Sequence, residues 1–143
     1  MTMSQKTNIY RQLFRADMYQ LFSIGLDTPT PNNQQTLHRI VSDLRGVTTW
    51  PIPEADYQAL SAWLQKLIET LKQSRIRDLL DEHHRLFLTQ AVCPFSEGSY
   101  HLAERGPILG DISAFYQAFH LRPGEMTGPP DSLKTELAFM HFM

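Results

Sequence analysis

The residues best suited to chemistry gather in one short stretch, Asp-Glu-His-His at positions 81–84. Histidine and carboxylate side chains can bind zinc or transfer protons. In a helical zinc motif, however, the two histidines stand four residues apart on one face, whereas His83 and His84 are adjacent and diverge. His83 also follows Ile76 by seven residues within an apolar stripe. This pattern favours a buried, hydrogen-bonded histidine over a metal ligand.

Other candidates for catalysis have weaker support. Asp78 and Glu82 lie four residues apart, with Arg85 three residues further along, a spacing typical of charged pairs on an exposed helix face. Cys93 is the single cysteine and precedes a proline in a loop, which favours an incidental thiol over a reactive one. The Walker A, dinucleotide-binding and G-x-S-x-G motifs are all absent from the sequence. We therefore expect no enzymatic activity, no metal and no other cofactor.

Length and composition indicate one ordinary folded domain over residues 1–143. Hydrophobic residues make up 42% and charged residues 20% of the chain, which suits a packed core rather than disorder. A net charge of −2 gives no electrostatic reason to expect nucleic acid as a partner. One cysteine precludes an internal disulfide, and no apolar run reaches the ~18 residues that a membrane span needs. We expect a cytoplasmic protein without membrane insertion.

Apolar residues recur at helical spacing along almost the whole chain, and no window shows the sustained alternation of a strand. Some single residues indicate boundaries: Gly46 suits the left-handed position after a helix, Pro53 the first helical position, and Asp111 an N-cap. The fold class that follows is all-α, a single-domain bundle of about six helices. The expected helices cover residues 9–26, 34–45, 53–73, 75–90, 111–121 and the stretch that begins at 131.

Three stretches, in order, resemble a known family. They are "EHHRLFL" at 82–88, "CPFSEGSYHL" at 93–102, and "GDISAFYQAFHL" at 110–121 followed after a variable loop by "GPPDSLKTELAFM". In order and spacing these stretches resemble the TorD/DmsD-type redox-enzyme maturation chaperones, which serve molybdenum-containing reductases. The stretch "WPIPEADYQAL" upstream is also similar to that family. Two departures are Ser132, where the family often has histidine, and a central loop longer than usual.

The resemblance implies a function without catalysis. Members of the family bind the twin-arginine signal peptide of an apo-reductase, and often its body, until the molybdopterin cofactor is inserted, which prevents premature export. By this resemblance, the partners of the chain are an apo-molybdoenzyme and its twin-arginine signal peptide. A receptor for such a peptide needs an apolar groove with carboxylates at its rim, because arginine pairs bidentately with carboxylate.

The motif-bearing segments would supply this peptide-binding region. Asp131 and Glu136 are placed to meet the arginines, although Asp131 is equally suited to be the N-cap of the last helix. The aromatic members are also suited to the core. The expected peptide-binding region comprises Leu86, Phe87, Pro94, Phe95, Tyr100, Gly110, Phe115, Tyr116, Pro130, Asp131, Leu133 and Glu136.

Two alternatives stay open beside the chaperone. One is a small-molecule or metal-binding helical protein, or an enzyme, that uses the cluster Glu82, His83 and His84. The other is a helical assembly or regulatory subunit. Stoichiometric zinc or iron in the purified protein would favour the first of these, whereas affinity for a twin-arginine peptide would favour the chaperone.

The last expected helix raises the question of what covers it. Leu133, Leu137 and Met140 form an apolar stripe, and such a helix is normally buried. The residues that widen this stripe beyond one face are Phe139, Phe142 and Met143. Members of the resembled family are typically longer, so we expect a chain that is truncated at its C-terminus and lacks its last helices. The helix could pair or exchange with that of a second copy, or fold back on the upstream core. We expect a homodimer through the terminal helix.

Overall fold

The computed structural model describes residues 3–47, 52–88, 92–100, 105–121 and 128–143. Within these residues the fold is all-α, with six α-helices, one short 3₁₀ turn and no strand, which confirms the predicted fold class. None of the helices in this described part is both long and apolar enough to cross a membrane. The elements are α1 (Met3–Gly25), α2 (Pro31–Gly46), α3 (Glu54–Gln73), α4 (Ile76–Phe87), η1 (Glu97–Ser99), α5 (Arg105–Ala118) and α6 (Leu133–Phe142).

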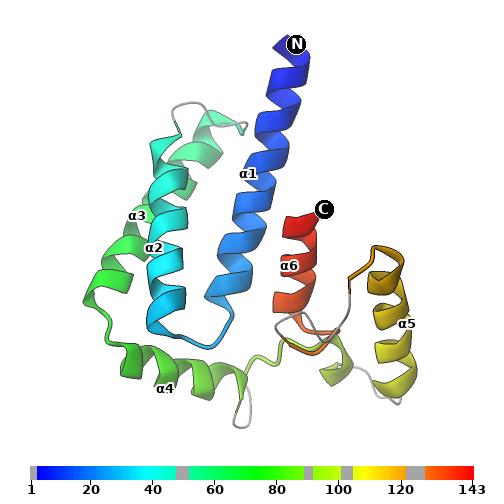
Figure 1. The fold of residues 1–143 in the computed structure, drawn as a ribbon. Coiled ribbons are helices and arrows are strands. Elements are labelled where there is room, and N and C mark those ends of the chain that lie inside the picture. Colours follow the sequence, from blue (N-terminus) through cyan, green and yellow to red (C-terminus); the bar gives the residue numbers. More distant parts are fainter. Residues whose placement is uncertain (1–2, 48–51, 89–91, 101–104, 122–127) are drawn as a thin grey trace.

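The helices form two groups on either side of α1 (Figure 1). On one side stand α2 and α3, with α4 crossing beneath them, and on the other stand α6 and then α5. α6 returns to the first helix, since His141 Nδ1 lies 2.9 Å from the carbonyl oxygen of Ala16. At the other end of the contact, the Ser23 hydroxyl donates to the carbonyl of Lys134 at 2.9 Å. The last helix therefore folds back on the upstream core, one of the two arrangements expected from the sequence.

The main hydrophobic core lies between α1, α2 and α3. Apolar residues three or four positions apart give each helix an inner face, and burying these faces together stabilises the fold. Trp63 lies at the edge of this core, with its ring centroid 5.8 Å from that of Phe22. The predicted inner faces are thus correct near the centre, whereas Tyr10 and Leu13 of α1 stay exposed. The buried members of the core cluster are Leu21, Ile40, Val41, Leu44, Leu64 and Ile68.

An aromatic cluster attaches α5 to α6. The ring of Phe139 on α6 lies 5.0 Å from Tyr116, 5.6 Å from Phe115 and 5.3 Å from Phe119, measured between ring centroids. Such tilted and edge-to-face pairs are favourable beyond their burial alone. Phe139 and Tyr116 are buried as a result. The cluster explains why the short helix α5 takes a defined position beside α6.

Several predicted helix ends are wrong. Gly46 belongs to α2, and the residue after it is extended; no glycine in the described residues has a positive φ angle. Pro53 is the N-cap of α3 rather than its first helical residue. Asp111 lies inside α5, which begins earlier than predicted. Pro107 fits the first turn of this helix because proline has no N–H and the N–H groups of a first turn have no acceptor within the helix. Helix α1 begins near residue 3 instead of 9, and α4 ends before 90, which lies outside the described residues.

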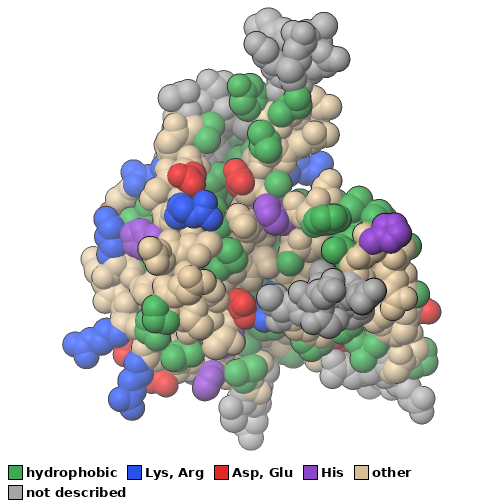
Figure 2. All heavy atoms as spheres, viewed as in Figure 1, with side chains coloured by type: hydrophobic (Ala, Val, Ile, Leu, Met, Phe, Trp, Pro, Cys, Tyr) green, Lys and Arg blue, Asp and Glu red, His purple; other side chains and the backbone are tan. Residues whose placement is uncertain are grey.

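Part of the apolar surface near the chain end remains exposed. α6 buries Phe139, but Phe142 is 62% and Met143 65% exposed. Tyr10 and Leu13 of α1 are exposed as well, and Leu13 lies one turn before the Ala16 carbonyl that meets His141. Figure 2 shows hydrophobic side chains along the upper part of α1 and near the end of α6. We call Tyr10, Leu13, Phe142 and Met143 the terminal apolar surface.

Candidate functional site

The loop at residues 92–100 and the start of α6 are joined by backbone hydrogen bonds. The Leu133 N–H donates to the carbonyl of Phe95 at 2.7 Å, and the Glu97 N–H donates to the carbonyl of Asp131 at 2.8 Å. Together they form a short antiparallel bridge between two segments that are distant in sequence. Two of the stretches that carry the family resemblance therefore meet at one place.

Asp131 lies at the centre of this junction and is 0% exposed. Its Oδ2 accepts a hydrogen bond from the backbone N–H of Gly98 at 3.1 Å. The N-cap of α6 is Ser132, whose hydroxyl accepts the N–H of Thr135 at 3.3 Å. The interpretation of Asp131 as the N-cap is therefore wrong, because the capping position falls one residue later and the Asp131 side chain binds the loop instead.

A cavity of about 530 Å³ opens between this loop and α6. Pro94, Phe95 and Leu133 give it apolar surface. The charged side chains among its described lining residues are all carboxylates. We call this cavity the acidic pocket; its lining comprises Cys93, Pro94, Phe95, Ser96, Glu97, Tyr100, Asp131, Leu133 and Glu136.

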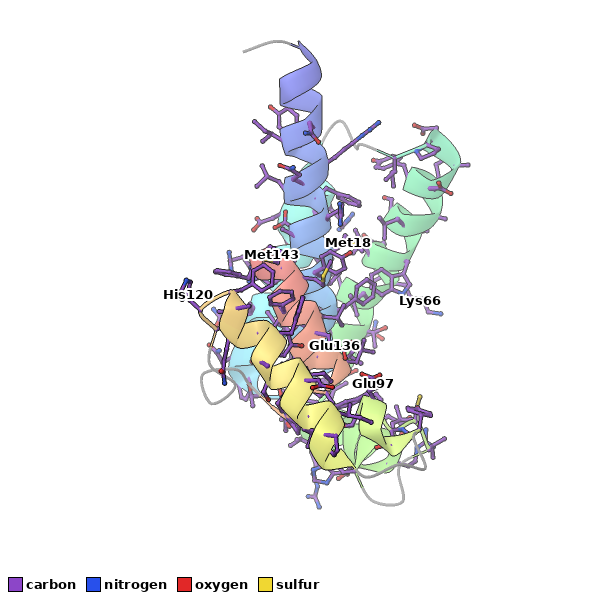
Figure 3. The ribbon with its side chains drawn as sticks, turned by 90° about the vertical axis from the view of Figure 1, so that its right-hand side faces the viewer. Met18, Lys66, Glu97, His120, Glu136 and Met143 are labelled. Atoms are coloured by element: carbon purple, nitrogen blue, oxygen red, sulfur yellow. The ribbon has the colours of Figure 1, made fainter. Side chains whose placement is uncertain are left out.

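Glu136 shows how strongly negative charge is concentrated in the acidic pocket. Burial raises the pKa of its carboxyl above the ordinary value of 4.5, and the charges of Glu97 and Asp131 raise it further. Glu97 and Glu136 lie close together in Figure 3. Burial, followed by the charge of Glu136, also raises the pKa of the Tyr116 hydroxyl. A cationic group in the acidic pocket would offset this repulsion.

Half of the residues predicted for peptide binding line the acidic pocket. They are Pro94, Phe95, Tyr100, Asp131, Leu133 and Glu136. The Tyr100 hydroxyl donates to the carbonyl of Pro94 and so closes the loop on itself. The structure thus places in one cavity six residues that the sequence analysis assigned to a single binding region.

Other residues predicted for peptide binding do not line the acidic pocket but contact the segments that form it. The ring of Phe87 lies 4.7 Å from that of Phe95, measured between centroids. The Leu86 carbonyl accepts the N–H of Cys93 at 2.9 Å, which connects the end of α4 to the loop. The Tyr116 hydroxyl donates to the carbonyl of Pro130 at 3.2 Å. These contacts hold the loop and the start of α6 in position.

Two predicted residues lie elsewhere. Gly110 is exposed on α5, and a side chain placed there would meet open space. Phe115 is also exposed on α5, where it packs against Phe139. Neither of them lines the acidic pocket. Glu97, in contrast, lines the pocket and was not predicted, because only the bridge between the loop and α6 brings it near Glu136.

Of the two histidines in the cluster at residues 81–84, one is buried and the other is exposed. His83 is buried, with Nε2 3.3 Å from the carbonyl oxygen of Leu26, which confirms the predicted hydrogen-bonded histidine. His84 is exposed, and Glu82 pairs with Arg85 at 2.6 Å on the helix surface. Across the described residues, no three histidine, cysteine or acidic side chains form a group that could hold a metal ion.

Comparisons with known proteins support the family resemblance and the fold. The family described as "Nitrate reductase delta subunit" matches residues 53–143. The fold is similar to the crystal structure of a candidate redox enzyme maturation protein from Archaeoglobus fulgidus, with a TM-score of 0.67 and 20% sequence identity over 89% of this chain and 70% of that one. No curated protein matches the sequence at a significant level. The predicted resemblance is confirmed: the chain belongs to the nitrate reductase delta subunit family, whose members are redox-enzyme maturation chaperones and not enzymes.

Proposed function

We propose that this chain is a cytoplasmic chaperone for a molybdopterin-containing reductase. It binds the apo-reductase and its twin-arginine signal peptide, holds them until the cofactor is inserted, and so delays export. Residues 1–143 act in this as one chaperone domain. The arginines of the peptide enter the acidic pocket, where Glu97, Asp131 and Glu136 lie, and its apolar segment contacts the neighbouring apolar wall.

The observation that carries this proposal is a group of three carboxylates beside an apolar wall. Burial, followed by the charges of Glu97 and Asp131, raises the pKa of Glu136, so desolvation and repulsion both disfavour its ionised form. A guanidinium group would relieve that repulsion and could bind a carboxylate through two parallel hydrogen bonds. Guanidinium is also more weakly hydrated than ammonium, and this suits a site formed partly by Phe95 and Leu133.

A synthetic peptide with two adjacent arginines followed by an apolar segment tests the proposal by isothermal titration calorimetry. We expect it to bind, and replacement of both arginines by alanine should weaken binding at least about tenfold, since a hydrogen bond to a charged group contributes roughly 1.5–3 kcal/mol. Equal affinity for the two peptides would contradict the role of the arginines. Failure of both peptides to bind would contradict peptide recognition altogether.

A charge-removing variant locates the arginine site. Glu136→Gln should lower affinity for the arginine peptide by about tenfold and leave affinity for the alanine peptide unchanged. Glu54→Gln is the matched control, because Glu54 is exposed at the start of α3 and does not line the acidic pocket. Equal losses in the two variants would place the arginines elsewhere.

A further inference from the structure

A second cavity, of about 410 Å³, shares residues 94–96 with the acidic pocket. It lies between the segment that follows α1, the second half of α4 and the start of α6. His83 and Phe87 of α4 and Lys134 of α6 belong to its lining. We call this cavity the histidine pocket. Because the two cavities share part of their walls, one extended ligand could occupy both.

His83 is a buried polar side chain, only 6% exposed, in the wall of the histidine pocket. Its Nε2 lies 3.3 Å from the carbonyl oxygen of Leu26, and a carbonyl can only accept a hydrogen bond. Nε2 must therefore carry the proton, which leaves Nδ1 of the neutral ring as an acceptor. Nδ1 is buried and has no hydrogen-bond partner within the described part of the chain. A buried acceptor without a donor is costly, so its retention points to a ligand that supplies one.

The surroundings indicate what kind of donor fits. The His83 and Phe87 rings pack edge to face with centroids 5.2 Å apart, and Phe87 in turn contacts Phe95. The cation in this wall is Lys134, whose Nζ lies 2.6 Å from a carboxylate oxygen of Asp27. Asp27 offsets this charge, and the described lining of the histidine pocket contains no carboxylate that would bind a second cation. The histidine pocket therefore suits a neutral N–H donor within an apolar ligand, whereas the acidic pocket suits a cation.

We infer that Nδ1 of His83 accepts a hydrogen bond from a backbone N–H in the apolar segment of the client peptide. The inference rests on the proposed function, with the arginines in the acidic pocket and the following residues in the histidine pocket. Residues 94–96 form the boundary between the two, and Phe87 and Phe95 contact the apolar side chains of the peptide. A backbone amide is neutral, occurs at every residue other than proline, and is fully available in an extended peptide.

Nitrogen NMR of the histidine side chains tests the inference directly. The protein is labelled with ¹⁵N at histidine, and the synthetic twin-arginine peptide with an apolar segment is added. We expect the Nδ1 resonance of His83 to shift as this nitrogen gains a donor, while Nε2 remains protonated. An unchanged Nδ1 resonance at saturating peptide would overturn the inference, as would a water molecule retained on Nδ1 in a crystal structure of the complex.

Single backbone N-methyl groups in the apolar segment identify the donor. With the wild-type protein, one such methyl should weaken binding by about tenfold, because it removes the N–H that His83 accepts. In His83→Phe, which keeps an aromatic ring but has no acceptor, the same methyl should have no effect. His83→Gln offers a carbonyl acceptor and should recover part of the affinity. Equal effects of every methyl position in both proteins would overturn the inference.

These outcomes separate the inference from the proposed function. Arginine-dependent binding without any response of His83 overturns only the role of the histidine pocket. If neither the arginine peptide nor its alanine control binds, the proposed function fails and the inference fails with it. The NMR test uses the unmodified protein, so the inference remains testable even if a His83 variant does not fold.

Discussion

The carboxyl group of Glu136 makes the stability of the folded protein depend on pH. Its carboxyl has a raised pKa in the folded protein, chiefly through burial, so the folded state keeps this proton to higher pH than the unfolded chain does. The stability that this difference provides is fully present below the ordinary pKa of 4.5 and is lost as pH rises through the raised pKa. At neutral pH the ionised group is therefore a source of strain in the unliganded protein.

We expect Glu136→Gln to raise the free energy of unfolding at pH 7, because the substitution removes the buried charge and its repulsion from Glu97 and Asp131. The pH dependence of stability above pH 4.5 should also become flatter. Urea denaturation across this range measures both effects, and Glu54→Gln should follow the wild type. A Glu136→Gln variant less stable than the wild type at pH 7 would contradict the electrostatic explanation. Peptide affinity should change in the opposite direction, since arginine needs the ionised carboxylate.

At the scale of single elements, the end of α5 is conformationally unusual. His120 has φ 62°, in the left-handed region that non-glycine residues rarely adopt. The N–H of Leu121 donates to the carbonyl of Tyr116 at 3.1 Å, an arrangement typical of helix ends where glycine is preferred. A histidine there carries a steric cost that glycine would avoid.

His120→Gly should therefore raise the free energy of unfolding by about 0.5–1 kcal/mol, the steric gain being partly offset by the greater flexibility of glycine in the unfolded chain. His84→Gly is the matched control, because His84 is an exposed histidine within α4. It should lower stability by about 1 kcal/mol, the usual cost of glycine in a helix. Thermal and urea unfolding measure both variants. Destabilisation of similar size in both would show that position 120 does not favour glycine.

At the scale of the whole molecule, the terminal apolar surface predicts self-association. Tyr10, Leu13, Phe142 and Met143 are exposed in the monomer, and exposed apolar patches commonly mark contacts with other chains. A homodimer would bury this surface through a two-fold contact between equivalent faces. Light scattering should show a molar mass that rises toward twice that of the monomer as concentration increases.

Phe142→Glu should shift this equilibrium toward the monomer, because a charge would be buried in the contact. Val92→Glu provides the control, as Val92 is an exposed apolar residue outside the terminal apolar surface. A wild-type protein that stays monomeric at high concentration would contradict the dimer. Dissociation by Val92→Glu alone would place the contact elsewhere.

Helices and their inner faces could be predicted because their causes are local. Contacts three and four residues apart determine which side of a helix is apolar, and Ile40, Val41 and Leu44 are buried as this spacing requires. Helix ends were harder to predict, since several local signals compete. Asp111 looks like an N-cap, yet Pro107 lets the helix begin upstream.

The sequence by itself determined the helical class, the buried His83 and the order of motifs that identifies the family. Only the tertiary structure decided that Glu97 and Glu136 share one pocket, that Asp131 binds a loop, and that α6 returns to α1. The physical reason is the separation along the chain of the residues that interact. Periodicity acts between neighbours along the chain, whereas these contacts depend on backbone pairing and packing between segments that only the complete fold brings together.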